Sequence, residues 1–358
     1  MRWSGMVAMA RKELRQLGRD HRTVALLLFQ PLLMLVVFGY AASFDLDELP
    51  VGVMGAGATE LADRLPDRFT IDHLDVDGTP ADAEALLRAG DHAAVFLPDT
   101  EEVLVDGAQL FAARGITETL AAIPGTPEPE VRFNPDLETP PVLVPALAGI
   151  ILAFVGTVAT SLGVVRERQA GTMEQLAMLP LRPADVLVGK LVPYLALAVV
   201  NLAAVMTVAV WLFDVPFAGS VWLFALGALL FLIVTLALGL LVSTVSQNQG
   251  QAMQLAIMLT LPQILLSGAI FPIDAMPLAL RGLAALMPLT WFVEIARGVM
   301  LRAATFGDVS QALGVLAALG AAALSIAVLR VRGDLLPTRP GGPSAGPAPR
   351  EPVEAVRS

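Results

Sequence analysis

The sequence contains no cysteine among its 358 residues. This absence excludes disulfide bonds, thiolate nucleophiles and cysteine-ligated metal sites. Histidine is nearly absent too, and His21, His73 and His92 lack the spacing of paired metal ligands. The sequence also has no Gly-x-x-x-x-Gly-Lys-Ser/Thr phosphate loop. We therefore expect this chain to bind no metal or cofactor, to hydrolyse no ATP by itself and not to be an enzyme.

Hydrophobic residues, by contrast, make up 56% of the chain, which is more than a soluble protein normally contains. A bilayer core about 30 Å thick needs roughly 20 apolar residues of helix. Six runs meet this requirement and predict transmembrane helices at 23–44, 141–165, 187–213, 219–245, 252–271 and 308–329. A further apolar stretch is broken by Pro277 and Pro288, so we expect residues 272–303 to form an outward re-entrant hairpin, because broken backbone is poorly tolerated in lipid. Residues 141–329 would hold this hairpin and the last five of the six helices.

Charge is distributed unevenly along the chain. Residues 45–140 hold 21 acidic and 5 basic residues, although the net charge of the whole chain is only −10. Lys and Arg concentrate in the leader, in the loop after residue 165 and in the tail, which predicts that these segments are cytoplasmic. Both termini would then be cytoplasmic and the acidic segment extracytoplasmic, with Arg281, Arg297 and Arg302 as exceptions. The acidic total describes one domain, and we expect no nucleic-acid partner.

The two terminal segments have different patterns. In residues 1–22, apolar residues recur at helical spacing opposite a basic face, which predicts an amphipathic interfacial helix in contact with lipids of the cytoplasmic leaflet. The alternative is a basic leader that only sets the topology. Residues 330–358 are rich in Pro, Gly and Arg, and we expect them to form a disordered cytoplasmic tail.

Residues 45–140 alternate short apolar runs with amphipathic ones. This pattern predicts strands interleaved with helices, and therefore a small α/β domain between the first two spans. Pro-containing segments at 124–129 and 134–141 would form the stalk that returns to the membrane. Strands are expected around 51–54, 71–74, 93–97 and 103–105, and helices around 61–65, 83–88 and 110–123.

The loop 166–186 is the most charged of the predicted cytoplasmic loops. Thr172 can cap a short helix whose apolar edge includes Met173 and Leu176 and which Pro180 ends. A short helix of this kind could dock into a groove on a cytosolic partner. From the residues alone, a connecting loop that merely follows the positive-inside rule explains the pattern equally well.

Several stretches, in chain order, resemble one family, the type-2 ATP-binding-cassette (ABC-2) transporter permeases. The run Arg166–Leu176, followed by Pro180–Pro183 and Gly189-Lys190, resembles the signature loop of that family. The resemblance is to the subfamily with a large extracytoplasmic domain between the first and second transmembrane helices. Residues 103–107 are similar to the outward-domain strand and turn of this subfamily, and residues 247–254 to its second cytoplasmic loop. Residues 266–277 and 288–298 are similar to its outward hairpin.

The resemblance implies an α-helical polytopic membrane protein with six transmembrane helices, outward re-entrant helices and a small α/β extracytoplasmic domain. It implies as partners a cytosolic ABC ATPase dimer, which would bind ATP and Mg, and a second permease copy, either identical or a close paralogue. The implied function is to move an amphiphilic substrate (a drug, a lipid or a lipid-linked product) outward across the bacterial inner membrane. The alternative is a non-transporting docking or signalling protein with a ligand-binding outward domain.

By the same resemblance, the ATPase-coupling residues are Glu167, Arg168, Gly171, Thr172, Met173, Glu174, Gln175 and Leu176. A second candidate site lies on the hairpin, where Glu294 and Arg297 are about one helical turn apart. This spacing favours a local ion pair. The alternative is a role in an outward gate, because a carboxylate near the membrane is costly unless it is paired or hydrated.

Overall fold

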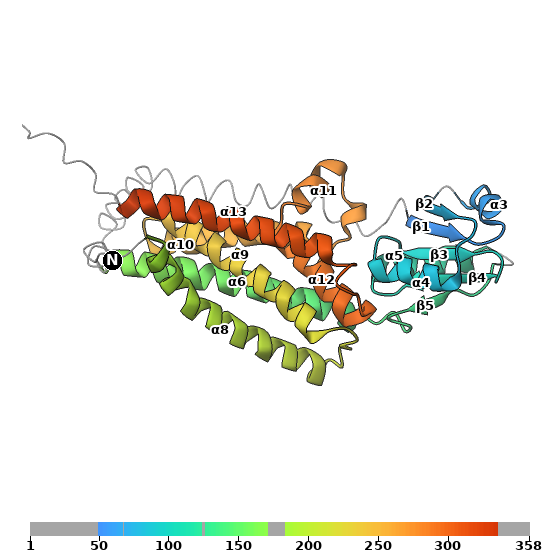
Figure 1. Ribbon diagram of the computed structural model, residues 1–358, viewed down its shortest axis with the longest axis horizontal. Helices are drawn as coiled ribbons and strands as arrows, with labels where there is room; N and C mark the ends of the chain where they lie inside the picture. Colours follow the sequence, from blue (N-terminus) through green and yellow to red (C-terminus); the bar gives the residue numbers. More distant parts are fainter. Residues whose placement is uncertain (1–48, 67, 124–125, 171–182, 336–358) are drawn as a thin grey trace, which may run out of the picture.

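The computed structural model describes residues 49–66, 68–123, 126–170 and 183–335. A bundle of long helices forms most of this structure, and a small α/β domain lies at one end of the bundle (Figure 1). The predicted leader helix 1–22, the first span 23–44 and most of the tail lie outside the described residues, as do Gly171–Leu176 of the predicted coupling loop. The predicted fold class, an α-helical polytopic membrane protein with a small α/β domain, is confirmed.

The α/β domain is built on a five-stranded sheet of order β2-β1-β3-β4-β5. Strand β1 pairs in parallel with β2 and β3, β3 pairs antiparallel with β4, and β4 pairs in parallel with β5. The strands are Leu49–Met54, Phe69–Asp75, Ala94–Leu97, Glu102–Asp106 and Glu130–Arg132, and the helices are α3 (Ala58–Ala62), α4 (Pro80–Ala89) and α5 (Leu110–Ala121).

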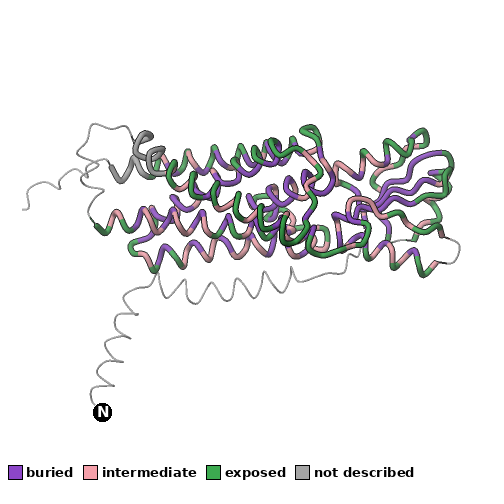
Figure 2. The backbone as a smooth tube through the Cα atoms, turned by 90° about the horizontal axis from the view of Figure 1, so that it is seen from below, coloured by how far each residue is buried: buried purple, intermediate pink, exposed green. Residues whose placement is uncertain are grey.

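Alternation along the strands creates two apolar layers, one on each face of the sheet. Phe96 packs on one face with Ile116 of α5, whereas its neighbours Val95 and Leu97 pack on the other face with Leu87 of α4. Because both faces are covered, the central strands are buried along nearly their whole length (Figure 2). Each of the seven predicted strands and helices overlaps an observed one, although α3 begins three residues earlier than predicted, at Ala58. Strand β5 is additional and lies between the two predicted stalk segments.

The helix bundle follows the α/β domain in the chain. Four described helices are long and apolar enough to cross a membrane, and the count becomes five if α11 and α12, which are bent by 80°, are one broken span. The helix at the predicted span 252–271 is only 18 residues long, ends at Leu266 and is not among these four. The elements are α6 (Thr139–Gln169), α8 (Pro183–Leu212), α9 (Val221–Val245), α10 (Gln249–Leu266), η1 (Ile273–Ala275), α11 (Leu278–Ala284), α12 (Pro288–Arg302) and α13 (Ser310–Leu335).

Helix α9 forms the centre of the bundle. In its most apolar window 61% of the residues are buried, compared with 11% in the window of α8, which lies at the periphery. The rings of Phe231 on α9 and Phe292 on α12 stack with their centroids 4.5 Å apart. Gly239 allows α9 to approach α6, since a Cβ atom there would lie only 2.6 Å from the carbonyl oxygen of Thr157. Helix α9 therefore packs closely against both α6 and α12 in the apolar core of the bundle.

Candidate functional site

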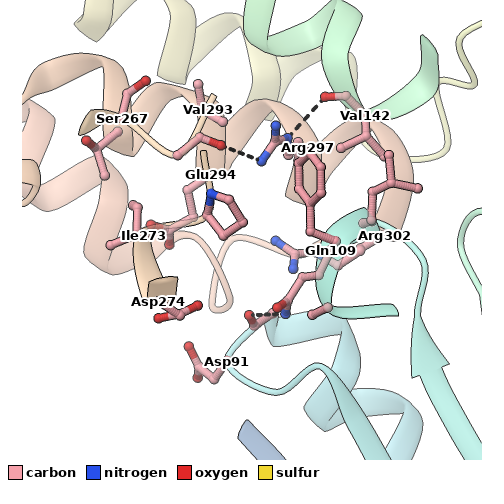
Figure 3. Close-up of a pocket in the computed structure, with 18 of the residues that line it drawn as sticks. Asp91, Gln109, Val142, Ser267, Ile273, Asp274, Val293, Glu294, Arg297 and Arg302 are labelled. Atoms are coloured by element: carbon pink, nitrogen blue, oxygen red, sulfur yellow. Dashed lines mark hydrogen bonds between the residues drawn. The ribbon is translucent and has the colours of Figure 1, made fainter. Parts of the chain in front are cut away.

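A pocket of about 430 Å³ lies where the α/β domain meets the helix bundle, and we call it the junction pocket. Most of its lining comes from four segments: the turn after α4, the start of α5, the segment Ser267–Asp274 after α10, and helix α12 (Figure 3). Pro50, Val142 and Gln311 complete it. The pocket contains the predicted gate residues Glu294 and Arg297.

A buried ion pair joins the two domains beside this pocket. Nη1 of Arg302, the last residue of α12, lies 3.2 Å from Oδ2 of Asp106, the last residue of β4. The side chains are 7% and 0% exposed, respectively, so the pair is shielded from water. The other carboxylate oxygen accepts a hydrogen bond from the backbone N–H of Ala108 at 2.9 Å. Burial raises the pKa of Asp106, and the Arg302 guanidinium opposes this shift.

The turn after α4 closes over the guanidinium of Arg302. Gly90 caps α4 with φ at 89°, a left-handed conformation, and a Cβ atom there would overlap the Arg302 side chain. The side-chain amide of Gln109 fixes the turn, since Nε2 donates to the carbonyl oxygens of Gly90 and His92 at 2.9 and 3.1 Å. The turn, the start of α5 and the end of α12 therefore form one interlocked contact.

His92 follows this turn and is buried, with 8% of its surface exposed. Neither ring nitrogen has a hydrogen-bond partner among the residues that the structure describes, and the ring meets that of His73 edge-on with the centroids 5.9 Å apart. Burial lowers the pKa of His92, and the Asp91 carboxylate opposes this effect. The folded domain thus favours the neutral imidazole.

Arg297 has a different role from the one that its spacing suggested. Its guanidinium donates to three backbone carbonyl oxygens, those of Val142, Gly268 and Ala269, at 3.0 to 3.1 Å. These carbonyls belong to the start of α6 and to the turn after α10, so Arg297 ties three segments together. The expected ion pair with Glu294 is wrong: it is not among the ion pairs of the described residues, and the backbone carbonyl oxygens of the irregular turn at Gly268 and Ala269 occupy the guanidinium instead.

Arg281 resembles Arg297 in this respect. Its guanidinium donates to the carbonyl oxygens of Met276, at 2.8 Å, and Asp274. All three arginines that were exceptions to the charge pattern therefore have acceptors within the protein. Their positions reflect internal bonding of the hairpin and the junction.

The opposite end of the bundle brings the two predicted cytoplasmic loops together. Nη1 of Arg168, near the end of α6, lies 3.3 Å from the carbonyl oxygens of Ser243 and Ser246 at the end of α9. Gln249, at the start of α10, donates from Nε2 to the side-chain oxygen of Gln169 at 3.0 Å. Of the predicted coupling residues, the structure places Glu167 and Arg168 at this meeting point of three helices. The other six lie outside the described residues.

Sequence reasoning missed Asp106 and Gln109 as junction residues. Asp106 lies within a stretch singled out by the resemblance, but nothing in that stretch indicates its partner. The available signal was Arg302, a cation at the end of an apolar helix on the predicted outward side, where a buried carboxylate partner would have been needed. The sequence separation of 196 residues hides the pairing.

Comparison with known proteins gives a consistent assignment. Residues 107–301 match the family described as ABC-2 type transporter. The chain is 31% identical to the probable multidrug ABC transporter permease YbhS of Escherichia coli K12 over 336 residues, covering 84% of this chain and 89% of that protein. It is 28% identical to the probable multidrug ABC transporter permease YbhR of the same organism, covering 85% and 91%.

A more distant relative is ABC transporter G family member 20 of Dictyostelium discoideum, which is 26% identical over 49% of this chain and 24% of that protein. No solved structure matches the chain. The match to the family covers the end of α6 and part of the junction pocket, including Glu294 and Arg297 but not Asp91 or Arg302, and the similarity to YbhS extends over most of both proteins. The chain therefore belongs to the ABC-2 type transporter family and is a membrane permease subunit of an ABC transporter, whose ATP hydrolysis takes place on a separate ATPase.

Proposed function

We propose that this permease is part of an exporter that moves an amphiphilic substrate outward across the bacterial inner membrane, with both termini in the cytoplasm. The observation that carries the proposal is helix α6. Its 31 residues run without interruption from the junction between the bundle and the α/β domain to the predicted coupling loop. At a rise of about 1.5 Å per residue, one helix of this length is roughly 46 Å long. Helix α6 is thus long enough to connect events at the two faces of the membrane.

Both ends of α6 are bonded to neighbouring helices. At the far end, Arg168 holds the carbonyl groups that end α9. Near its start, the carbonyl oxygen of Val142 accepts a hydrogen bond from Arg297 of α12. A push on the coupling loop would therefore move α6 together with α9, α10 and α12, because packed helices with bonded ends move as bodies. The expected effect is a change at the junction pocket.

The push would come from a cytosolic ATPase dimer that binds the loop. We propose that Glu167, Arg168, Gly171, Thr172, Met173, Glu174, Gln175 and Leu176 form the contact, with the charged residues setting the register and the apolar ones acting as anchors. A second permease copy, identical or a close paralogue, would complete the substrate path between the two chains. Membrane lipids would surround peripheral helices such as α8.

An amphiphilic substrate fits the composition of the bundle. Helix α9 contains no charged residue and α8 carries only Asp185 and Lys190, both near its start. Such apolar spans suit neither a metal ion nor a strongly charged solute, since desolvation of a charge in the membrane is costly. The names of the relatives YbhS and YbhR, which refer to multidrug transport, support a drug-like amphiphile as the substrate class.

Transport by the permease with its partner ATPase in proteoliposomes tests this proposal. ATP added outside reaches only the complexes whose ATPases face outward, so an exporter accumulates a fluorescent amphiphile in the lumen. Loss of preloaded dye upon ATP addition would instead indicate import. If the permease stimulates the ATPase but no amphiphile of a broad panel moves in either direction, the docking or signalling function replaces transport.

A further inference from the structure

The junction pocket carries an imbalance of charge. Three carboxylates line it, and each comes from a different segment: Asp91 from the turn after α4, Asp274 from η1 and Glu294 from α12 (Figure 3). Within the described part of the chain, none of these three side chains forms an ion pair or a hydrogen bond. They are therefore available to a ligand.

The two arginines that line the same pocket are already engaged. Arg302 is paired with Asp106, and the guanidinium of Arg297 is surrounded by the carbonyl oxygens of three residues. Neither one neutralises the carboxylates by direct contact. The pocket consequently favours a positive charge, because opposite charges attract more strongly in a cavity that is partly shielded from water.

The remaining lining of the pocket combines apolar and aromatic side chains with a few neutral polar ones, such as Gln109, Ser267 and Thr290. Trp291 and Ile273 lie on the bundle side, and Leu110 lies on the side of the α/β domain. The indole N–H of Trp291 donates to the carbonyl oxygen of Ala285 at 2.8 Å, which fixes the ring in place. A fixed indole ring can attract an organic cation through its π face. Hydrophobic walls with a few carboxylates are suited to a cation that carries apolar groups.

The size of the cavity agrees with this type of ligand. Small-molecule sites commonly measure roughly 300–1,000 Å³, and the junction pocket falls in this range at about 430 Å³. We propose that the junction pocket binds a lipophilic monocation, with Glu294, Asp91 and Asp274 supplying the negative charge and Trp291 one wall. The bound cation would be the exported substrate, and in this respect the inference rests on the proposed function. Binding itself requires neither ATP nor transport.

Two hydrophobic ions of nearly equal size and opposite charge, tetraphenylphosphonium and tetraphenylborate, test the proposal. The full-length chain in nanodiscs of zwitterionic lipid, without ATPase or ATP, is equilibrated with each ion, and empty nanodiscs give the background. We expect saturable binding of tetraphenylphosphonium, with a Kd at least about tenfold lower than that of tetraphenylborate. A difference of this size is what the interaction of the cation with one well-placed carboxylate would produce. Equal affinity for the two ions would overturn the proposal.

Variants locate the site. Glu294→Gln should weaken tetraphenylphosphonium binding by about tenfold, and the double variant Asp91→Asn with Asp274→Asn by about two- to fivefold, because both carboxylates are exposed. The second variant keeps the test valid if Glu294→Gln does not fold. Glu118→Gln, the same charge change on the exposed face of α5, should have no effect.

The outcomes separate this inference from the exporter. Unchanged tetraphenylphosphonium affinity in the folded pocket variants would refute the pocket, even if ATP-driven export is observed. Binding that depends on the charge of the ion and on the three carboxylates supports the pocket, even if export fails in proteoliposomes.

Discussion

The buried pair Asp106–Arg302 allows a prediction whose magnitude follows from the structure. Replacing Arg302 by Met leaves the Asp106 carboxylate, which is 0% exposed, without its countercharge. Removing one partner of such a pair typically costs about 3–5 kcal/mol, whereas removing both costs far less. Since 1.4 kcal/mol is a tenfold change, opening of the junction should become about a hundredfold or more easier in Arg302→Met. The double variant with Asp106→Asn should recover most of that loss.

Hydrogen exchange measures this opening directly. The amides of the Gly90–His92 turn and of Ala108 should exchange faster in Arg302→Met, while the amides of α9 keep their protection. Arg64→Met is the matched control, because the Arg64–Glu60 pair is 72% exposed on both sides and should contribute only about 0–1 kcal/mol. Additive effects of Arg302→Met and Asp106→Asn, or an unchanged turn in either single variant, would refute the claim that this pair holds the domains together.

Three further predictions concern single residues. Gly90→Ala should lower the unfolding temperature, at a cost of about 1–3 kcal/mol, because φ is 89° and the new Cβ overlaps Arg302. Gly57→Ala isolates the strain contribution, because φ is 91° there but the new Cβ would make only ordinary van der Waals contact with Pro98, at 3.8 Å. Because burial lowers the pKa of His92, the unfolded state binds more protons, so the stability of the α/β domain should fall as the pH drops below 6.5, and His92→Gln should reduce this acid sensitivity in thermal unfolding. Glu174→Lys should uncouple ATP hydrolysis from transport, and unchanged efflux at normal expression would count against the loop as the coupling element.

The α/β domain was largely predictable because its signal is local. Strands such as Ala94–Leu97 are uninterrupted apolar runs, and Thr79 with Asp82 forms the capping box that begins α4. Strand β5 could not be predicted in the same way. It consists of three residues, and only Val131 among them is apolar. Its existence depends on pairing with β4, a contact that periodicity does not encode.

The junction was less predictable because its bonds connect distant segments. The spacing of Glu294 and Arg297 predicted an ion pair from helix geometry alone. In the structure the guanidinium instead donates hydrogen bonds to the carbonyl groups of Gly268 and Ala269, because a helix end inside the protein leaves carbonyl acceptors that need donors. A sequence gives the positions of charged side chains along a helix. The backbone carbonyl groups that compete with a carboxylate for an arginine are known only from the fold.

Internal bonding of the arginines also bears on the proposed orientation. Arg281, Arg297 and Arg302 lie on the predicted outward side, where the positive-inside rule expects few cations. Each one is held by carbonyl groups or by a buried carboxylate, so each has a structural reason to be there. The same bonds join the hairpin, α12 and the α/β domain into one unit around the junction pocket. We therefore expect cations on this side to be retained for their contacts, while the leader and the loop 166–186 determine the topology.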